Sequence, residues 1–179
     1  KLPIINKEDV RLNFDKLRSV KPSKLQMVQS TSGTTGKPMK FEIDMRTEAY
    51  HNAVKQFLKE MASVKQGWSG VMAGIKILPS HKYKPPFWIK NYYNKQIHYS
   101  SYHLNQDTFG YYEDHMREYG IRYLDGYPTS IGSLARFILD AGRTLKIDAV
   151  FSSSQPVQAW SREAIEKAFQ CQIYDFYAL

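Results

Sequence analysis

The hydrophobic and polar positions of the chain alternate between helical and strand spacing along its length. Near the amino terminus, Val10, Phe14 and Leu17 share one helical face, and Asn6 before them is typical of a helix N-cap, so the pattern predicts a helix over residues 6–19. Apolar residues at helical spacing predict four further helices: residues 46–66 ended by Gly67, 105–119 ended by Gly120, 129–142 ended by Gly142, and 158–169.

Short apolar or alternating runs between these helices predict strands over residues 41–44, 70–78, 121–126, 146–154 and 171–178. Because strands and helices alternate, we expect an α/β fold in which a mostly parallel sheet is flanked by helices. Functional loops of such folds follow the carboxyl ends of the strands. The candidate loops are therefore residues 30–38, 126–130, 152–156 and the segment after Tyr177.

The composition is that of a globular protein. The chain has 179 residues, of which 42% are hydrophobic, so it is long enough for a substantial core. No run approaches the ~18 consecutive apolar residues of a membrane span, and no secretory leader opens the sequence. The one cysteine, Cys171, cannot form an internal disulfide, and we interpret it as a small hydrophobic residue. We therefore expect a cytoplasmic protein.

A net charge of +8 invites a second interpretation, that of a basic nucleic-acid-binding domain. Lysines and aromatic residues alternate within residues 80–95. Proteins use this combination to bind single-stranded nucleic acid, with lysines on the phosphates and rings stacked on the bases. The alternative is a surface segment whose rings pack inward and whose lysines are solvated. The sequence favours this alternative, because no RNA-binding signature accompanies the segment.

The loop at residues 30–38, STSGTTGKP, has the composition of a phosphate-binding loop. Gly33 and Gly36 allow the backbone to turn its N–H groups toward an anion, the hydroxyl side chains add donors, and Lys37 adds a positive charge. The spacing is not that of a Walker A loop, because two residues separate the glycines and Pro38 follows the lysine. From composition alone, a flexible polar turn remains an alternative.

The string T-S-G-T-T-G-x-P resembles the phosphate-loop signature of the adenylate-forming superfamily. The segments LPIINKEDVRLNF, SSYHLN, GYPTSIGSLARFI and AVFSSSQPVQAWSREAIEKAFQCQIYDFYAL resemble its phenylacetate–CoA ligase-like branch. Within that branch they are most similar to the subgroup assigned to capsular polysaccharide biosynthesis. The resemblance runs in order over nearly the whole chain and is weakest over residues 67–99.

The resemblance implies roles for three groups of residues. The β- and γ-phosphates of ATP would be bound by Thr31, Ser32, Gly33, Thr34, Thr35, Gly36 and Lys37. The adenine side of the nucleotide would be lined by Ser153, Ser154, Gln155, Pro156 and Tyr177. The acyl pocket would be walled by Tyr127 and Pro128, and His103, near a predicted strand end, is a further candidate for it, although a structural histidine is the alternative.

The implied reaction activates a small carboxylic acid with ATP and Mg²⁺ to an acyl-adenylate, which is then transferred to a thiol such as that of coenzyme A. A carrier protein or an amine is left open as the acceptor. No residue of the chain is expected to be certainly catalytic or to bind the metal. Residues 1–179 would be a fragment of one large amino-terminal adenylation domain, without its carboxy-terminal part and small mobile domain, and inactive alone. The alternative is a catalytically inactive binding module in polysaccharide biosynthesis, which Met39 and Gln155 favour because they depart from the family pattern.

Overall fold

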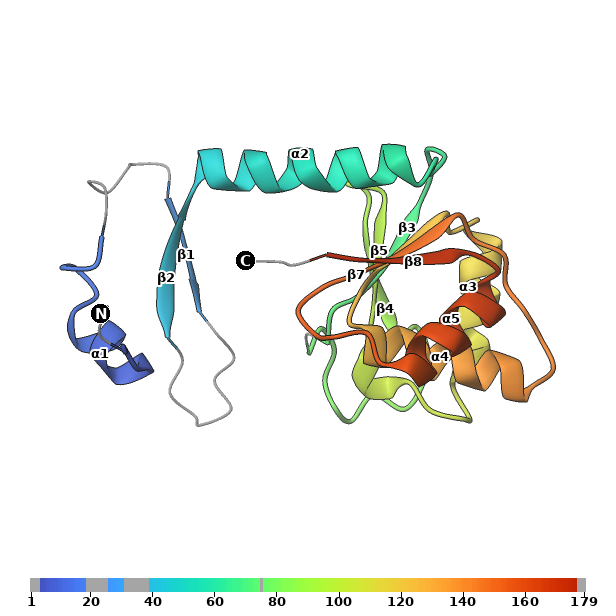
Figure 1. Ribbon diagram of the computed structural model, residues 1–179. Coiled ribbons are helices and arrows are strands. Elements are labelled where there is room, and N and C mark those ends of the chain that lie inside the picture. Colours follow the sequence, from blue (N-terminus) through green and yellow to red (C-terminus); the bar gives the residue numbers. More distant parts are fainter. Residues whose placement is uncertain (1–3, 19–25, 31–38, 75, 177–179) are drawn as a thin grey trace. The chain divides into compact units, whose positions relative to one another are not determined.

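The computed structural model describes residues 4–18, 26–30, 39–74 and 76–176 (Figure 1). The chain divides into two compact units, Lys1–Leu58 and Lys59–Leu179. The division falls within the last turn of α2 (Met45–Met61). Each unit has its own sheet.

The first unit contains the helix α1 (Lys7–Leu12) and the strands β1 (Gln26–Ser30) and β2 (Lys40–Asp44). The predicted N-cap of α1 is confirmed: the Asn6 side chain accepts from the N–H groups of Glu8 and Asp9, and the Asp9 carboxylate accepts from the Asn6 N–H. The helix is shorter than predicted, because turns replace it after Leu12.

The apolar face predicted for this helix lines a cleft of about 490 Å³ in the first unit. Val10, Phe14 and Leu17 contribute to one side of it, and residues of β2 contribute to the rest. Across the same cleft Arg18 donates through Nε to Glu42 at 2.8 Å. The strands β1 and β2 pair antiparallel, with Ser30 opposite Lys40, in a two-stranded sheet of their own.

The second unit is built on a six-stranded sheet with the order β4-β5-β3-β6-β7-β8 (Figure 1). All neighbouring strands are parallel except β4 and β5, which form an antiparallel hairpin. The predicted fold class is therefore confirmed. The strand bounds are β3 (Ser69–Met72), β4 (Trp88–Asn91), β5 (Gln96–Tyr99), β6 (Tyr123–Gly126), β7 (Ala149–Ser152) and β8 (Gln172–Asp175).

Three helices connect the parallel strands: α3 (Phe109–Glu118), α4 (Pro128–Asp140) and α5 (Ala159–Phe169). A 3₁₀ turn, η1 (Ser101–His103), precedes α3. The connections from β5 to β6, from β6 to β7 and from β7 to β8 all run in the same direction across the sheet. Because such connections are right-handed, the three helices lie on one face of the sheet, where α4 packs against α3 and α5 (Figure 1). The core lies between these helices and the residues of the strands that point toward them, including Leu124, Val150 and Ile173.

The ends of the elements follow the sequence signals in some places and not in others. Gly120 and Gly142 take positive φ angles of 56° and 69° just after their helices, as predicted. The prediction that Gly67 ends the long helix is wrong, because α2 ends at Met61 and Ser63 takes the left-handed conformation there, with a φ of 52°. The strand predicted over residues 70–78 stops at Met72.

Residues 80–95 contain β4, a strand that the hydrophobic periodicity did not predict. Phe87 is 1% exposed and Trp88 is partly buried, so these two rings pack inward as the surface-segment interpretation expects. Tyr83, Tyr92 and Tyr93 do not, since they are 86%, 71% and 95% exposed. The hairpin therefore buries only the rings that face α3 and leaves the others in solvent.

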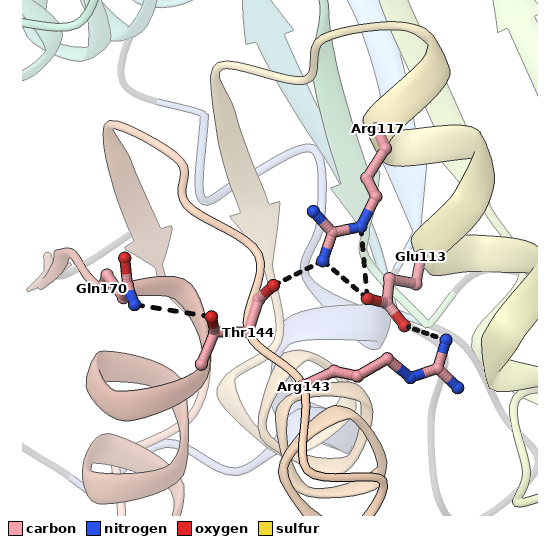
Figure 2. A network of polar contacts seen from close by, with 5 residues as sticks. All are labelled: Glu113, Arg117, Arg143, Thr144 and Gln170. Carbon is pink, nitrogen blue, oxygen red and sulfur yellow. Dashed lines mark hydrogen bonds and ion pairs between the residues drawn. The ribbon is translucent and has the colours of Figure 1, made fainter.

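Beyond the amino ends of the parallel strands, a buried carboxylate joins two helices and a loop (Figure 2). Glu113 of α3 is 1% exposed. Its Oε1 accepts from Arg117 Nη2 at 2.8 Å, and its Oε2 lies 3.1 Å from Nη1 of Arg143, just after α4. Arg117 also donates to the carbonyl of Thr144, whose hydroxyl accepts from Gln170 at the end of α5. One carboxylate thus holds the carboxyl end of α4 against α3.

We predict that Glu113→Ala destabilises the protein by about 2–3 kcal/mol, because it removes the buried carboxylate through which two half-exposed arginines, Arg117 and Arg143, join α3 to the end of α4. Urea denaturation followed by circular dichroism measures this. The matched control is Glu166→Ala, which removes an exposed pair with Arg162 on α5 and is expected to cost about 0.5 kcal/mol or less. Equal losses in the two variants would contradict the assigned role of Glu113.

His115 of α3 is a second buried titratable group on the same helix. Its side chain lies between the rings of Trp88 and Tyr119, with ring centroids 3.9 Å and 4.4 Å away, and its Nδ1 is 2.9 Å from the Tyr99 hydroxyl. Burial, and then the positive charge of Lys90, lower the pKa of His115 to about 4. The folded protein therefore holds this imidazole neutral at pH values where the unfolded chain would protonate it.

Stability should consequently fall as the pH drops from about 6.5 toward 4, with a loss of about 2 kcal/mol between pH 7.5 and pH 5 from this residue. Urea midpoints at the two pH values measure the loss. In His115→Phe, which keeps a ring in the stack but cannot titrate, we expect that part of the pH dependence to disappear. The exposed His81, changed to Gln, is the control and should leave it unchanged. An unaltered pH dependence in His115→Phe would refute the assignment.

Candidate functional site

The carboxyl ends of four parallel strands lie in one row. The ladder pairs Met72 with Gly126, Gly126 with Ser152, and Ser152 with Asp175, which are the last residues of β3, β6, β7 and β8. The segments that follow these strands therefore leave the sheet at the same edge. This row brings together two of the predicted functional loops, residues 126–130 and residues 152–156, and the predicted segment after Tyr177 lies outside the described residues.

Gly126 makes the close spacing of this row possible. Its φ is 151°, and a Cβ built at this position would lie 2.4 Å from the backbone oxygen of Met72. Any side chain here would push β6 away from β3. The next residue, Tyr127, donates its N–H to the same Met72 oxygen at 3.1 Å. The chain thus turns out of β6 directly over the end of β3.

Tyr127 and Pro128, the residues predicted for the acyl pocket, lie at the centre of this edge. Tyr127 is half-buried, and its ring packs against Gly74, where an added Cβ would come within 2.7 Å of Cε2. Pro128 is buried as the first residue of α4, and its carbonyl accepts from the buried Ser161 hydroxyl at 2.6 Å. The bond to α5 holds the start of α4 in place, so the position of Tyr127 is firmly supported.

The residues predicted for the adenine side follow β7. The Ser152 hydroxyl donates to the Asp175 carboxylate at 3.1 Å, and the Ser152 carbonyl accepts from the Phe176 N–H at 3.0 Å, so the ends of β7 and β8 are joined. Ser154 takes a positive φ of 69°. Gln155 accepts through Oε1 from the Thr129 hydroxyl at 2.9 Å. That bond links the loop after β7 to the first turn of α4. Thr129 and Asp175 are contributors that the sequence reasoning did not single out.

His103 lies at the same edge, after β5, but both of its ring nitrogens are engaged within the protein. Nδ1 is 2.7 Å from the Ser100 hydroxyl, and Nε2 is 3.1 Å from the carbonyl oxygen of Pro79. The ring stacks on Phe87 and is 8% exposed. These contacts are what a structural histidine makes, and its role in an acyl pocket stays a prediction.

The predicted phosphate loop and Tyr177 lie outside the described residues: this applies to Thr31, Ser32, Gly33, Thr34, Thr35, Gly36, Lys37 and Tyr177. The residues that flank the loop correct one expectation. The loop joins β1 to β2, which pair antiparallel, so it does not follow a strand of the parallel sheet. The ATP-binding assignments of these residues stay predictions.

Metal and thiol chemistry find little support among the described residues. No group of three or more His, Cys, Asp or Glu side chains in that part of the chain is arranged to hold a metal ion. Burial, followed by the charges of Glu166 and Asp148, raises the pKa of the Cys171 thiol to about 12. A thiol with so high a pKa is a poor nucleophile at neutral pH, which agrees with a packing role for Cys171. No helix within the described ranges is long and apolar enough to cross a membrane.

The chain is similar over its length to a curated protein. Protein CapK of Staphylococcus aureus is 34% identical to it over 180 residues, a match that takes in 99% of the chain and 40% of CapK. The chain thus spans about two fifths of this relative. No family model matches the chain.

Solved structures with the same fold include a CoA ligase and an acyl-CoA synthetase. The structure of 2-hydroxyisobutyryl-CoA ligase in an open conformation, in complex with 2-HIB-AMP and CoA, matches with a TM-score of 0.61 at 16% identity, over 99% of this chain and 43% of that one. An acyl-CoA synthetase of Brucella canis matches with a TM-score of 0.51 at 16% identity, over 85% of this chain and 27% of that one. The chain is therefore related to part of Protein CapK over 99% of its own residues. It also shares the fold of the amino-terminal part of adenylate-forming acyl-CoA ligases, and the two findings confirm the resemblance found in the sequence.

Proposed function

We propose that this chain forms the nucleotide- and acid-binding part of an AMP-forming ligase, which activates a carboxylic acid with ATP to an acyl-adenylate and passes the acyl group to a thiol. The observation that carries the proposal is the row of strand ends at Met72, Gly126, Ser152 and Asp175, from which the predicted acyl and adenine segments leave side by side. The shared fold with acyl-CoA ligases supports the same reading.

In the first step, an oxygen of the substrate carboxylate attacks the α-phosphorus of ATP, the bond from that phosphorus to the bridging oxygen breaks, and pyrophosphate leaves. The chain's part in this step is to position both reactants and to stabilise negative charge. Residues 31–37 would hold the β- and γ-phosphates through N–H groups, hydroxyls and Lys37. Tyr127 would orient the acid beside the end of β6, and residues 153–156 would hold the adenine side.

Coenzyme A is the acceptor we propose, because the matched 2-hydroxyisobutyryl-CoA ligase is solved with CoA and an acyl-adenylate. In the second step the acceptor's sulfur attacks the acyl carbon, the bond from that carbon to the AMP oxygen breaks, and AMP leaves. Mg²⁺ bound to the nucleotide would neutralise phosphate charge. The described residues offer it no cluster of carboxylates, so we assign no step of this chain to the metal.

A second candidate is a binding module of the same fold without catalysis. The observation that favours it is the bond from Thr129 to Gln155 at 2.9 Å, which joins the first turn of α4 to the loop after β7 through two uncharged side chains. Such a module would bind a nucleotide and not turn it over. It would serve as a scaffold in polysaccharide assembly.

Exchange of labelled pyrophosphate into ATP, measured on the protein at its natural length, tests the proposal. We expect exchange that requires an added carboxylic acid and falls by about 100-fold in Lys37→Ala, the loss typical of removing one charge-stabilising donor. The exposed Lys16, changed to Ala, is the matched control and should leave the rate unchanged.

ATP binding without any exchange would favour the binding module and refute the ligase. Binding of single-stranded RNA, with an affinity that falls steeply between 50 mM and 200 mM salt and exceeds that for ATP, would instead indicate the nucleic-acid-binding domain. The exposed rings of Tyr83, Tyr92 and Tyr93 make that comparison necessary.

A further inference from the structure

The net positive charge of the second unit comes from one stretch of sequence, because all of the unit's acidic residues lie outside it. Residues 62–106 contain no aspartate or glutamate and six lysines: Lys65, Lys76, Lys82, Lys84, Lys90 and Lys95. Three of these, at positions 76, 82 and 84, lie in residues 76–86, which we name the basic loop. This segment connects β3 to β4. The adenylation chemistry proposed above makes no use of it.

Topology puts the basic loop at the candidate site. The chain leaves β3 at its carboxyl end and enters β4, which runs antiparallel to β5, at the same edge of the sheet. Gly74, just before the loop, packs against the ring of Tyr127. The loop therefore begins beside the residue predicted to wall the acyl pocket.

The foot of the basic loop is anchored, while its charged residues are exposed. The Pro79 carbonyl lies 3.1 Å from His103 Nε2 and accepts from the Lys82 N–H at 3.1 Å. At the other end Phe87 is buried against the His103 ring. Lys76 and Lys84 are exposed and Lys82 is partly exposed, and none of the three has an acidic neighbour within the stretch. The loop therefore holds three lysines, exposed or partly exposed, on a backbone that is anchored at this edge, and we call these lysines the positive patch.

The order of the strands says which part of a ligand would reach the patch. The predicted adenine segments follow β7 and β8, the predicted acyl segment follows β6, and the basic loop follows β3, the next strand in the same direction. An acyl-adenylate laid along this edge has its adenine at one end, its mixed anhydride near the middle and the tail of the acid at the other end. The tail of the acid would therefore point toward the lysines.

We propose that the basic loop binds a second anionic group at the far end of the carboxylic acid, so that the substrates are acids with a carboxylate or phosphate in addition to the group that is activated. This inference rests on the proposed function and names its substrate class. An acid whose tail carries no charge would gain no binding energy from the lysines of the basic loop. With a dianionic acid, Lys82 and Lys84 supply the complementary charge.

The test compares acids of equal length in pyrophosphate exchange without any thiol, on the protein at its natural length. Adipate is matched with hexanoate, and 1,4-phenylenediacetate with 4-ethylphenylacetate. We expect the dianionic member of a pair to have the lower KM. In the double variant Lys82→Ala/Lys84→Ala, its KM should rise about tenfold while that of the monoanionic acid stays unchanged. The preference should also shrink as salt is raised.

The matched control removes two exposed lysines at the opposite edge of the sheet, Lys65 before β3 and Lys146 before β7, and should leave the preference intact. Three outcomes would overturn the inference: a preference for the monoanionic acids, an equal effect of the double variant on both members of a pair, or an effect that appears only when coenzyme A is added. The last would assign the loop to the acceptor.

A second measurement separates failure of this inference from failure of the proposed function. Adipate and hexanoate are titrated against the protein by calorimetry, with no turnover required. Tighter binding of adipate that is lost in Lys82→Ala/Lys84→Ala supports the basic loop even if no exchange occurs, in which case the ligase activity alone is refuted. Equal binding of the two acids refutes the loop assignment whether or not exchange is seen.

Discussion

The contact between Gly126 and the backbone of Met72 is the constraint on which the candidate site depends. Without a side chain at Gly126, β6 lies close enough to β3 for Tyr127 to donate to the Met72 carbonyl, and the chain can turn sharply into α4. The parallel register then carries the alignment to Ser152 and Asp175. The segments assigned to the acid and to the adenine side are neighbours because of this spacing.

The two edges of the parallel sheet have different electrostatic character. Near the amino ends of the strands, the buried Glu113 is neutralised by Arg117 and Arg143, and Asp148 pairs with Arg122 at 2.6 Å, so positive and negative charges meet within the protein. At the carboxyl edge, the lysines of the basic loop have no such partners within the stretch that carries them. Paired charges at the amino edge serve stability, and at the other edge we assign the lysines of the basic loop to a ligand.

Rigid packing supports the charged edge from behind. His103, which the sequence offered as an acyl-pocket candidate, ties the loop after β5 to the foot of the basic loop through Pro79 and stacks on Phe87. Nearby, Tyr112 donates to the Ser100 carbonyl at 2.7 Å, and burial raises the pKa of its hydroxyl. These buried contacts leave the exposed lysines free to meet solvent while the backbone beneath them stays fixed.

Local sequence patterns were enough to predict the fold class and the order of the long helices. They also predicted the N-cap at Asn6 and the glycines that end α3 and α4, because these features depend on local periodicity and backbone conformation. The motif at residues 31–38 and the ordered segments after it also pointed to the adenylate-forming fold. Only the tertiary structure decided the rest. Three features depend on contacts between separate segments of the chain, which no local pattern indicates. They are the hairpin of β4 and β5, the antiparallel pairing of β1 with β2, and the hydrogen bond between Thr129 and Gln155. The basic loop is the clearest case: its lysines are visible in the sequence, but their place beside Tyr127 follows from the direction in which β3 and β4 run, and strand direction is set by long-range pairing.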